Sequence, residues 1–212
     1  MATRPANASG ASPGWIARSR RFVALAITLS LAAAASYAVV LNLVPLLTER
    51  GITPTAAAVV LGVGGAGQVL GRLAFPALTR LLGVRARTAL IVGAVAVTTA
   101  LLASFASLPA VVPAATLAGA VRGMLTLLNA TAVTDRWGVG HYGRLTGLLS
   151  ARVTVTGALS PWVGAVAALH GYAATVWVMS GLAVAAVVTG LASLPRAVDE
   201  RMPTVRRSGS TL

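Results

Sequence analysis

Three arginines, Arg72, Arg122 and Arg152, interrupt long uncharged stretches of the sequence. Each carries a permanent charge on a planar guanidinium that matches the two oxygens of a carboxylate. Such a charge inside a membrane costs from about 2.5 to more than 10 kcal/mol, so it must face protein or a water-filled cavity. The stretches contain no Asp or Glu to neutralise it. The counter-charge must therefore come from a bound anion or from another chain.

Arg122 lies on a stripe of polar and small residues spaced three and four apart, which places them on one helix face. The stripe consists of Thr116, Gly119, Arg122, Thr126 and Asn129. The candidate substrate-binding residues are Arg122, Arg72, Gln68, Thr126, Asn129, Tyr37 and Arg152. Arg72 and Arg152 are also near enough to the expected cytoplasmic surface to extend to it, which is the alternative role for these two.

The residues that a metal, thiolate, serine-protease or dinucleotide site would require are missing from the sequence. With no Cys, two His and four acidic residues, the chain offers no metal cluster or thiolate. An intramembrane serine protease needs a His on a helix after its Ser, but both histidines precede Ser180. Gly62–Gly67 spells G-x-G-x-x-G, yet residues 82–92 lack the acid that a dinucleotide ribose requires. We predict no enzyme activity, catalytic residue, metal or cofactor.

The composition indicates which elements hold these residues. The chain is 57% hydrophobic and 10% charged, whereas a soluble domain carries roughly 25% charged residues. Its uncharged runs are as long as the roughly 20 residues that a membrane-spanning helix needs, or longer. They cover residues 22–48, 51–71, 88–121 and 153–195. We therefore predict an all-α integral membrane protein.

Six spans fit the pattern, and they make up one membrane domain over residues 22–195. The expected spans are 22–47, 54–79, 88–107, 112–134, 145–168 and 172–194. Thr53 and Pro54 are typical of a helix start, and the prolines of "SLPAVVP" predict the turn after the third span. Residues 1–21 are expected to be a disordered basic tail, and residues 196–212 a second basic tail.

The arginines outside the spans indicate the orientation. Thirteen fall in the tails and alternate loops: Arg4, Arg18, Arg20, Arg21, Arg80, Arg85, Arg87, Arg136, Arg144, Arg196, Arg201, Arg206 and Arg207. The opposite loops hold only Arg50. Because positive loops stay in the cytoplasm, we expect both termini there, in the cell (inner) membrane. The +13 charge is thus a topology signal and does not indicate a nucleic-acid partner.

Glycines at a spacing of four predict helix contacts, because close approach through small residues holds membrane helices together. The spacing occurs at Gly67 and Gly71, at Gly119 and Gly123, and at Gly143 and Gly147. The alternative is that glycine is simply frequent in membrane helices. In the fifth span, Pro161 between Gly157 and Gly164 predicts a bend, either a gate or a fixed kink.

Three segments together resemble the C-terminal six-helix half of a major facilitator superfamily transporter. They are "ERGITPTAAAVVLGVGGAGQVLGRL", "PALTRLLGVRAR" and "GMLTLLNATAVTDRWGVGHYGRLTGLLSARVTVTGALSPWVGA". The second is similar to the family's G-x-L-x-D-R-x-G-R-R loop at Leu78, Gly83 and Arg85. It differs at Arg80, which replaces the acid, and at Pro76, which replaces the first glycine. The resemblance implies two three-helix repeats.

The resemblance also implies a substrate site. The first, second, fourth and fifth spans correspond to helices that line the family's central cavity. Arg72 matches an arginine that contacts the substrate carboxylate in the monocarboxylate and oxalate/formate-like members, the subfamily most similar here. Gln68 replaces the acid usual one turn earlier. These correspondences imply alternating-access transport of a small organic anion.

Family members have two such halves with the substrate between them, whereas one is expected here. The chain would then be a truncated frame, one subunit of a split transporter or a homodimer. The expected partners are an anionic substrate, the lipid bilayer, and a second six-helix half or second copy. The alternative function is a non-transporting six-span subunit or transporter remnant that acts only in assembly.

Overall fold

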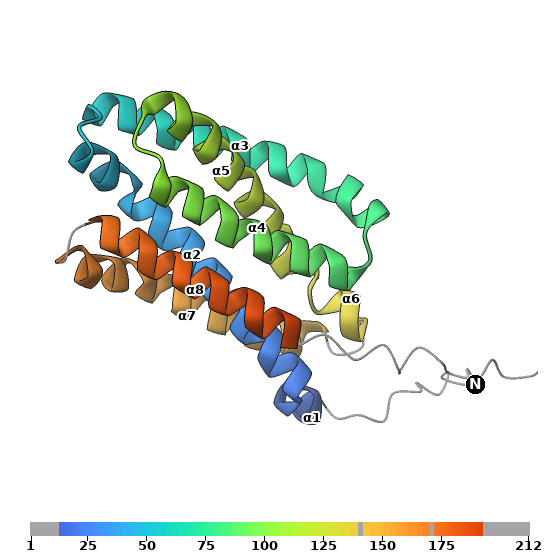
Figure 1. Ribbon diagram of the computed structural model, residues 1–212. Coiled ribbons are helices and arrows are strands. Elements are labelled where there is room, and N and C mark those ends of the chain that lie inside the picture. Colours follow the sequence, from blue (N-terminus) through green and yellow to red (C-terminus); the bar gives the residue numbers. More distant parts are fainter. Residues whose placement is uncertain (1–12, 140–141, 170–171, 193–212) are drawn as a thin grey trace, which may run out of the picture.

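The computed structural model describes residues 13–139, 142–169 and 172–192, which form eight helices and no strand (Figure 1). The helices are α1 (Pro13–Arg18), α2 (Arg20–Glu49), α3 (Pro54–Leu81), α4 (Val84–Ser104), α5 (Leu108–Thr131), α6 (Thr134–Trp137), α7 (Tyr142–Ala168) and α8 (Tyr172–Ala192). The all-α prediction is therefore confirmed.

The six long helices lie alongside one another in one bundle (Figure 1). The closest partners are α3 and α5, which pack along each other. Helix α2 contacts α7 and α8 on one side and α3 and α4 on the other, and α4 lies between α5 and α8. Helix α2 is thus the central element of the bundle.

Four helices in the described part of the chain are long and apolar enough to cross a membrane: α2, α3, α4 and α5. Helix α7 has 27 residues. The described apolar stretch of α8, Val178–Gly190, is shorter than a span. The first four predicted spans are therefore matched by apolar helices, and the fifth and sixth stay predictions.

Helical structure begins earlier than the sequence predicts. Helix α1 lies within the tail that was expected to be disordered, because Ile16 and Ala17 pack against the bundle core. Ser19 separates it from α2, and the Ser19 hydroxyl accepts a hydrogen bond from the Phe22 amide at 3.2 Å. Ser19 is thus the N-cap that fixes the start of the first long helix.

The prolines act differently from one helix to the next. Thr53 caps α3 and accepts a hydrogen bond from the Ala56 amide at 3.3 Å, as predicted. The turn predicted from Pro109 and Pro113 is wrong, because α5 already begins at Leu108. Pro109 stands in the first turn, where amides have no intrahelical partner, and a membrane helix tolerates Pro113 further in.

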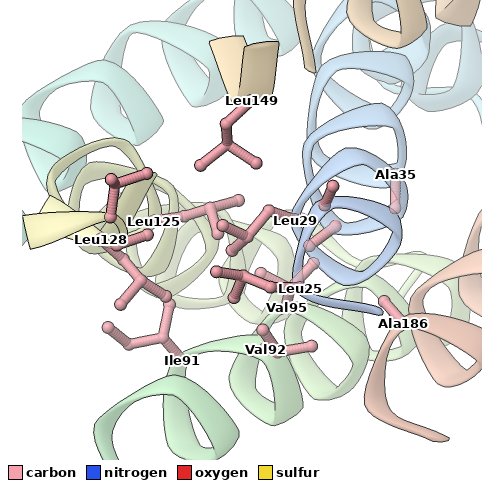
Figure 2. Packing of buried hydrophobic residues seen from close by; sticks show 14 of the residues in the cluster. Leu25, Leu29, Ala35, Ile91, Val92, Val95, Leu125, Leu128, Leu149 and Ala186 are labelled. Carbon is pink, nitrogen blue, oxygen red and sulfur yellow. The ribbon is translucent and has the colours of Figure 1, made fainter. Parts of the chain in front are cut away.

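The largest cluster of buried apolar side chains joins α2, α4, α5, α7 and α8, with Phe75 of α3 at its edge (Figure 2). Figure 2 labels Leu25, Leu29, Ala35, Ile91, Val92, Val95, Leu125, Leu128, Leu149 and Ala186. The alanine run of α2 from Ala32 to Ala35 is buried as well. Because small side chains allow close backbone approach, this run suits the central helix.

Candidate functional site

Helices α3 and α5 touch through glycines on both partners. A Cβ atom added at Gly67 would overlap the Thr116 carbonyl, and one at Gly71 would overlap the Ala120 carbonyl. In return, a Cβ at Gly123 would overlap the Gln68 carbonyl. Only glycine permits this approach.

The other glycines vary in their contacts. Gly119 meets the Gly64 carbonyl in the same crossing. In contrast, a Cβ at Gly143 or Gly147 would meet nothing within 4 Å in the described chain. The spacing alone therefore does not decide which glycines form a helix contact.

The crossing brings together candidate residues that are distant in the sequence. The backbone from Gln68 to Arg72 lies against the turn of α5 that holds Arg122 and Gly123. Arg72 is exposed and Gln68 is partly buried. Thr126 is exposed, and its hydroxyl donates to the Arg122 carbonyl at 2.9 Å.

Arg122 is partly buried between α2, α4 and α5. Its Nε is buried without a hydrogen-bond partner. It lines a cavity of about 10 Å³, room for about one water molecule. The other lining residues are Ser36, Val39, Val95, Thr98, Thr99, Leu102, Ala118 and Val121. Half-exposed Tyr37 of α2 lies within electrostatic range of Arg122.

The hydroxyls of this cavity were missed by the sequence reasoning. Ser36, Thr98 and Thr99 are buried, and each stands in an otherwise apolar run. That polar interruption was the available signal. Asn129 follows two turns after Arg122 on α5, and its Oδ1 is likewise buried without a partner. Two buried unpaired polar atoms therefore lie on this face of α5, and three others in the described chain belong to Arg87, Thr131 and Thr146.

Arg152 is not part of this group. It is exposed on α7, and its guanidinium carbon lies 5.7 Å from the centre of the Phe22 ring, a cation–π contact. Phe22 and the Ser36 of the Arg122 cavity stand about 20 Å apart along α2, at 1.5 Å per residue. The structure therefore separates Arg152 from Arg122.

Pro161 and Gly164 both lie within α7. Proline has no amide to donate to the Gly157 carbonyl one turn earlier. The Ser160 hydroxyl donates to that carbonyl instead, at 2.7 Å. A Cβ at Gly157 would stand 3.3 Å from the Tyr37 ring, so this part of α7 packs on a candidate residue of α2.

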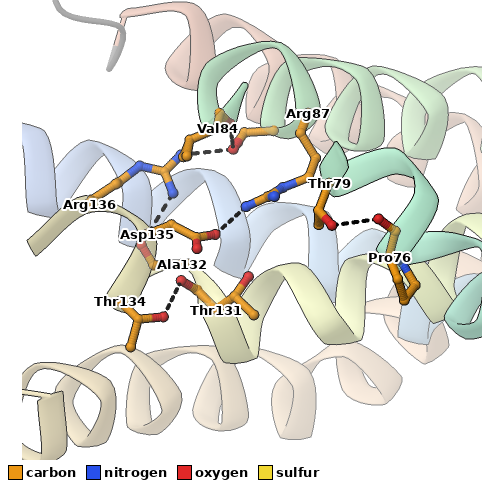
Figure 3. Close-up of polar contacts among 10 residues, drawn as sticks. Pro76, Thr79, Val84, Arg87, Thr131, Ala132, Thr134, Asp135 and Arg136 are labelled. Carbon is orange, nitrogen blue, oxygen red and sulfur yellow. Dashed lines mark hydrogen bonds and ion pairs between the residues drawn. The ribbon is translucent and has the colours of Figure 1, made fainter. Parts of the chain in front are cut away.

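A second polar cluster joins the start of α4 to α6 (Figure 3). Arg87 is 5% exposed, forms an ion pair with Asp135, and lies 5.3 Å above the Phe75 ring. Arg136 donates to the Thr88 hydroxyl at 2.8 Å and to the Ala132 carbonyl at 3.2 Å.

Electrostatics at this cluster act on Arg136 in both directions. Burial lowers the pKa of its guanidinium, nearby Asp135 raises that pKa, and Arg87 lowers it. Arginine starts from so high a pKa that it remains charged. The cluster therefore keeps two cations around one carboxylate.

At the other end of the bundle, Arg50 caps a helix. Its guanidinium donates to the carbonyls of Leu102, Ala103 and Phe105 at the C-terminus of α4. A cation is favourable there because those carbonyls have no intrahelical partner and form the negative end of the helix dipole. Arg50 thus has a structural role at this end of the bundle.

The sequence profile of the Major Facilitator Superfamily matches residues 23–209. The chain belongs to the major facilitator superfamily. It is therefore a multi-pass membrane protein of a transporter family and not of an enzyme family. No individual curated protein matches the chain. Among the described residues, no three His, Cys, Asp or Glu group together as metal ligands.

Proposed function

We propose that this superfamily chain acts as a six-helix, C-terminal-type half-transporter that carries a small organic anion by alternating access. Its spans would be α2, α3, α4, α5, α7 and α8. The helix contacts support two three-helix repeats, because α2 packs on α7 and α8 as α5 packs on α3 and α4. This pairing relates the first three long helices to the last three.

The observation that carries the anion assignment is Arg122. It is partly buried, its Nε is unpaired, and no acidic residue lies within the predicted spans. A cation in a weakly polar surround attracts an anion more strongly than in water. Arg72, which the α3–α5 crossing brings beside the Arg122 turn, would supply a second charge.

The finer substrate class rests on Arg72 and Gln68. Arg72 matches the carboxylate-contacting arginine of monocarboxylate and oxalate/formate-like members, so we propose a carboxylate. Gln68 replaces the acid, so we propose no proton relay through that position. Thr126, Asn129 and Tyr37 would complete the polar surface, and Gly157 and Pro161 on α7 would serve as the gate.

A second six-helix half or a second copy would complete the site. Arg72 is exposed nine residues before the end of the apolar helix α3, and Thr126 is exposed five residues before the end of α5. Exposed polar groups facing lipid are costly, so a partner or a water-filled cavity must cover them. A chain that transports as a monodisperse monomer in liposomes would contradict this part of the proposal.

The test compares Arg122→Lys and Arg122→Gln with wild type in uptake of labelled small carboxylates by membrane vesicles. Removing one charge-assisted hydrogen-bonded pair should lower apparent affinity about ten- to hundredfold. Lysine keeps the charge but loses the planar fork, so it should restore only part of the affinity. Arg144→Gln, an exposed arginine at the start of α7, is the matched control. If both variants fold and keep wild-type affinity, the anion assignment is wrong.

A further inference from the structure

A groove of about 290 Å³ lies on the outer surface where the start of α2 meets α8. Its lining residues are Arg18, Arg20, Val23, Ala24, Ile27 and Thr189. Val23 is 38% exposed and Ile27 is 44% exposed, so the groove opens outward. None of these residues belongs to the Arg122 site or to the Arg87 cluster.

The groove is charged at one end and apolar along its length. Arg18 and Arg20 are exposed, and neither pairs with a described residue. From Arg20, the wall continues through Val23, Ala24 and Ile27 on one face of α2, over about 10 Å. The Thr189 hydroxyl is engaged elsewhere, with the Ala185 carbonyl at 2.9 Å and the Thr28 hydroxyl at 3.1 Å. The two guanidiniums are therefore its free polar groups among the described residues.

The position of the groove fits the edge of a membrane. Arg20 begins α2, an apolar helix long enough to span. The guanidiniums thus stand where the apolar helix starts, and the apolar wall leads toward its middle. A soluble anion would leave that wall uncovered, whereas an uncharged lipid would leave both cations without a counter-charge.

We propose that this groove binds one anionic phospholipid. Its phosphate lies between Arg18 and Arg20, where guanidiniums make charge-assisted hydrogen bonds. One acyl chain lies along Val23, Ala24 and Ile27. Basic pockets beside membrane helices bind anionic headgroups in this way.

The test uses the full chain in mild detergent, titrated with short-chain phosphatidylglycerol and with phosphatidylcholine, and bound lipid is counted by native mass spectrometry. The double variant Arg18→Gln/Arg20→Gln should bind phosphatidylglycerol about 25-fold more weakly, about fivefold for each arginine. The control Arg80→Gln/Arg144→Gln removes two exposed arginines outside the groove and should stay within about twofold of wild type.

A second variant separates the apolar wall from the charges. Ala24→Phe fills the groove but keeps both arginines, so it should weaken phosphatidylglycerol binding as well. Size-exclusion profiles and thermal unfolding confirm that each variant is folded. Equal loss in the control pair would overturn the proposal, because binding would then reflect diffuse surface charge.

Two further outcomes would also overturn it. Inorganic phosphate that displaces the lipid at equal concentration would identify a site for soluble anions. Much tighter lipid binding by Asp199→Asn/Glu200→Gln would show that Asp199 and Glu200 of the same chain compete with lipid for the groove. Retained preference for phosphatidylglycerol over phosphatidylcholine in both experiments supports the lipid site.

Discussion

At the scale of single residues, Arg87 and Asp135 form the described ion pair that links α4 to α6. The Arg87 side chain is 6% exposed and that of Asp135 is 25% exposed. Removing one partner of a buried pair leaves an uncompensated charge, whereas replacing both by apolar residues is often neutral. Substituting one or both residues of the pair therefore shows whether it stabilises the protein through charge balance or through packing.

We expect Asp135→Asn to lower the free energy of unfolding by up to about 3 kcal/mol, limited by the partial exposure of Asp135. The double variant Arg87→Leu/Asp135→Leu should recover much of this loss, because neither charge then remains buried. Thermal unfolding of wild type, Arg87→Leu, Asp135→Leu and the double variant in detergent gives the coupling energy of the pair. Strictly additive losses would contradict the interpretation that the pair balances charge.

Residue types and spacing predicted some of these single-residue features and missed others. The depth of Arg122 and the absence of an acid beside it follow from counting along one helix. Ser36 and Thr98 could not be placed beside it, because their helices meet α5 only through tertiary packing. Arg87 was assigned to a loop, and only the fold shows that it is buried against Asp135 and Phe75.

At the scale of elements, the α3–α5 crossing depends on glycine at some positions and not at others. A Cβ at Gly71 would overlap the Ala120 carbonyl, whereas a Cβ at Gly65 on the same helix would meet nothing within 4 Å. Alanine normally stabilises a helix over glycine by about 0.8–1.0 kcal/mol. The two positions should therefore respond in opposite directions.

We expect Gly71→Ala to destabilise the protein by about 1–3 kcal/mol, because the helices must separate. Gly65→Ala should be neutral or stabilising by up to about 1 kcal/mol. Thermal unfolding midpoints in detergent compare the two variants directly. If Gly71→Ala is as stable as Gly65→Ala, the two helices do not cross as closely as the structure places them.

The helices themselves were largely predictable, because apolar runs of membrane length and the Thr53–Pro54 start have local causes. The error arose where Pro109 and Pro113 were taken as a turn, because Pro109 lies in the first turn of α5 and Pro113 lies inside that helix. In a membrane, neighbouring helices and side chains compensate for the missing amide, as the Ser160 hydroxyl does beside Pro161.

At the scale of the whole molecule, charge divides the bundle into two ends. Figure 1 shows α1, α6 and the α3–α4 connection at one end, and the α2–α3 connection at the other. The first end holds Arg18 of α1, Arg80 in the last turn of α3, Arg85 and Arg87 in the first turn of α4 and Arg136 of α6, whereas Arg50 stands at the second. Because the Arg50 guanidinium is hydrogen-bonded to carbonyls at the C-terminus of α4, it adds little unpaired positive charge to this second end.

This asymmetry predicts that both termini are cytoplasmic, because positive loops resist translocation. Reporter fusions at Arg50, Arg85, Pro109, Gly138, His170 and the C-terminus should alternate between outside and inside, starting outside. Alkaline phosphatase is active only outside and green fluorescent protein only inside. Each position is therefore tested with both reporters, and only one of the two should be active there. Replacing Arg80 and Arg85 by glutamine should make the connection between α3 and α4 less strictly cytoplasmic. Arg50→Gln should leave the position of that connection unchanged. Two or more positions on the wrong side would reject the six-span topology, and with it the proposal that Arg72 and Arg122 lie within membrane spans.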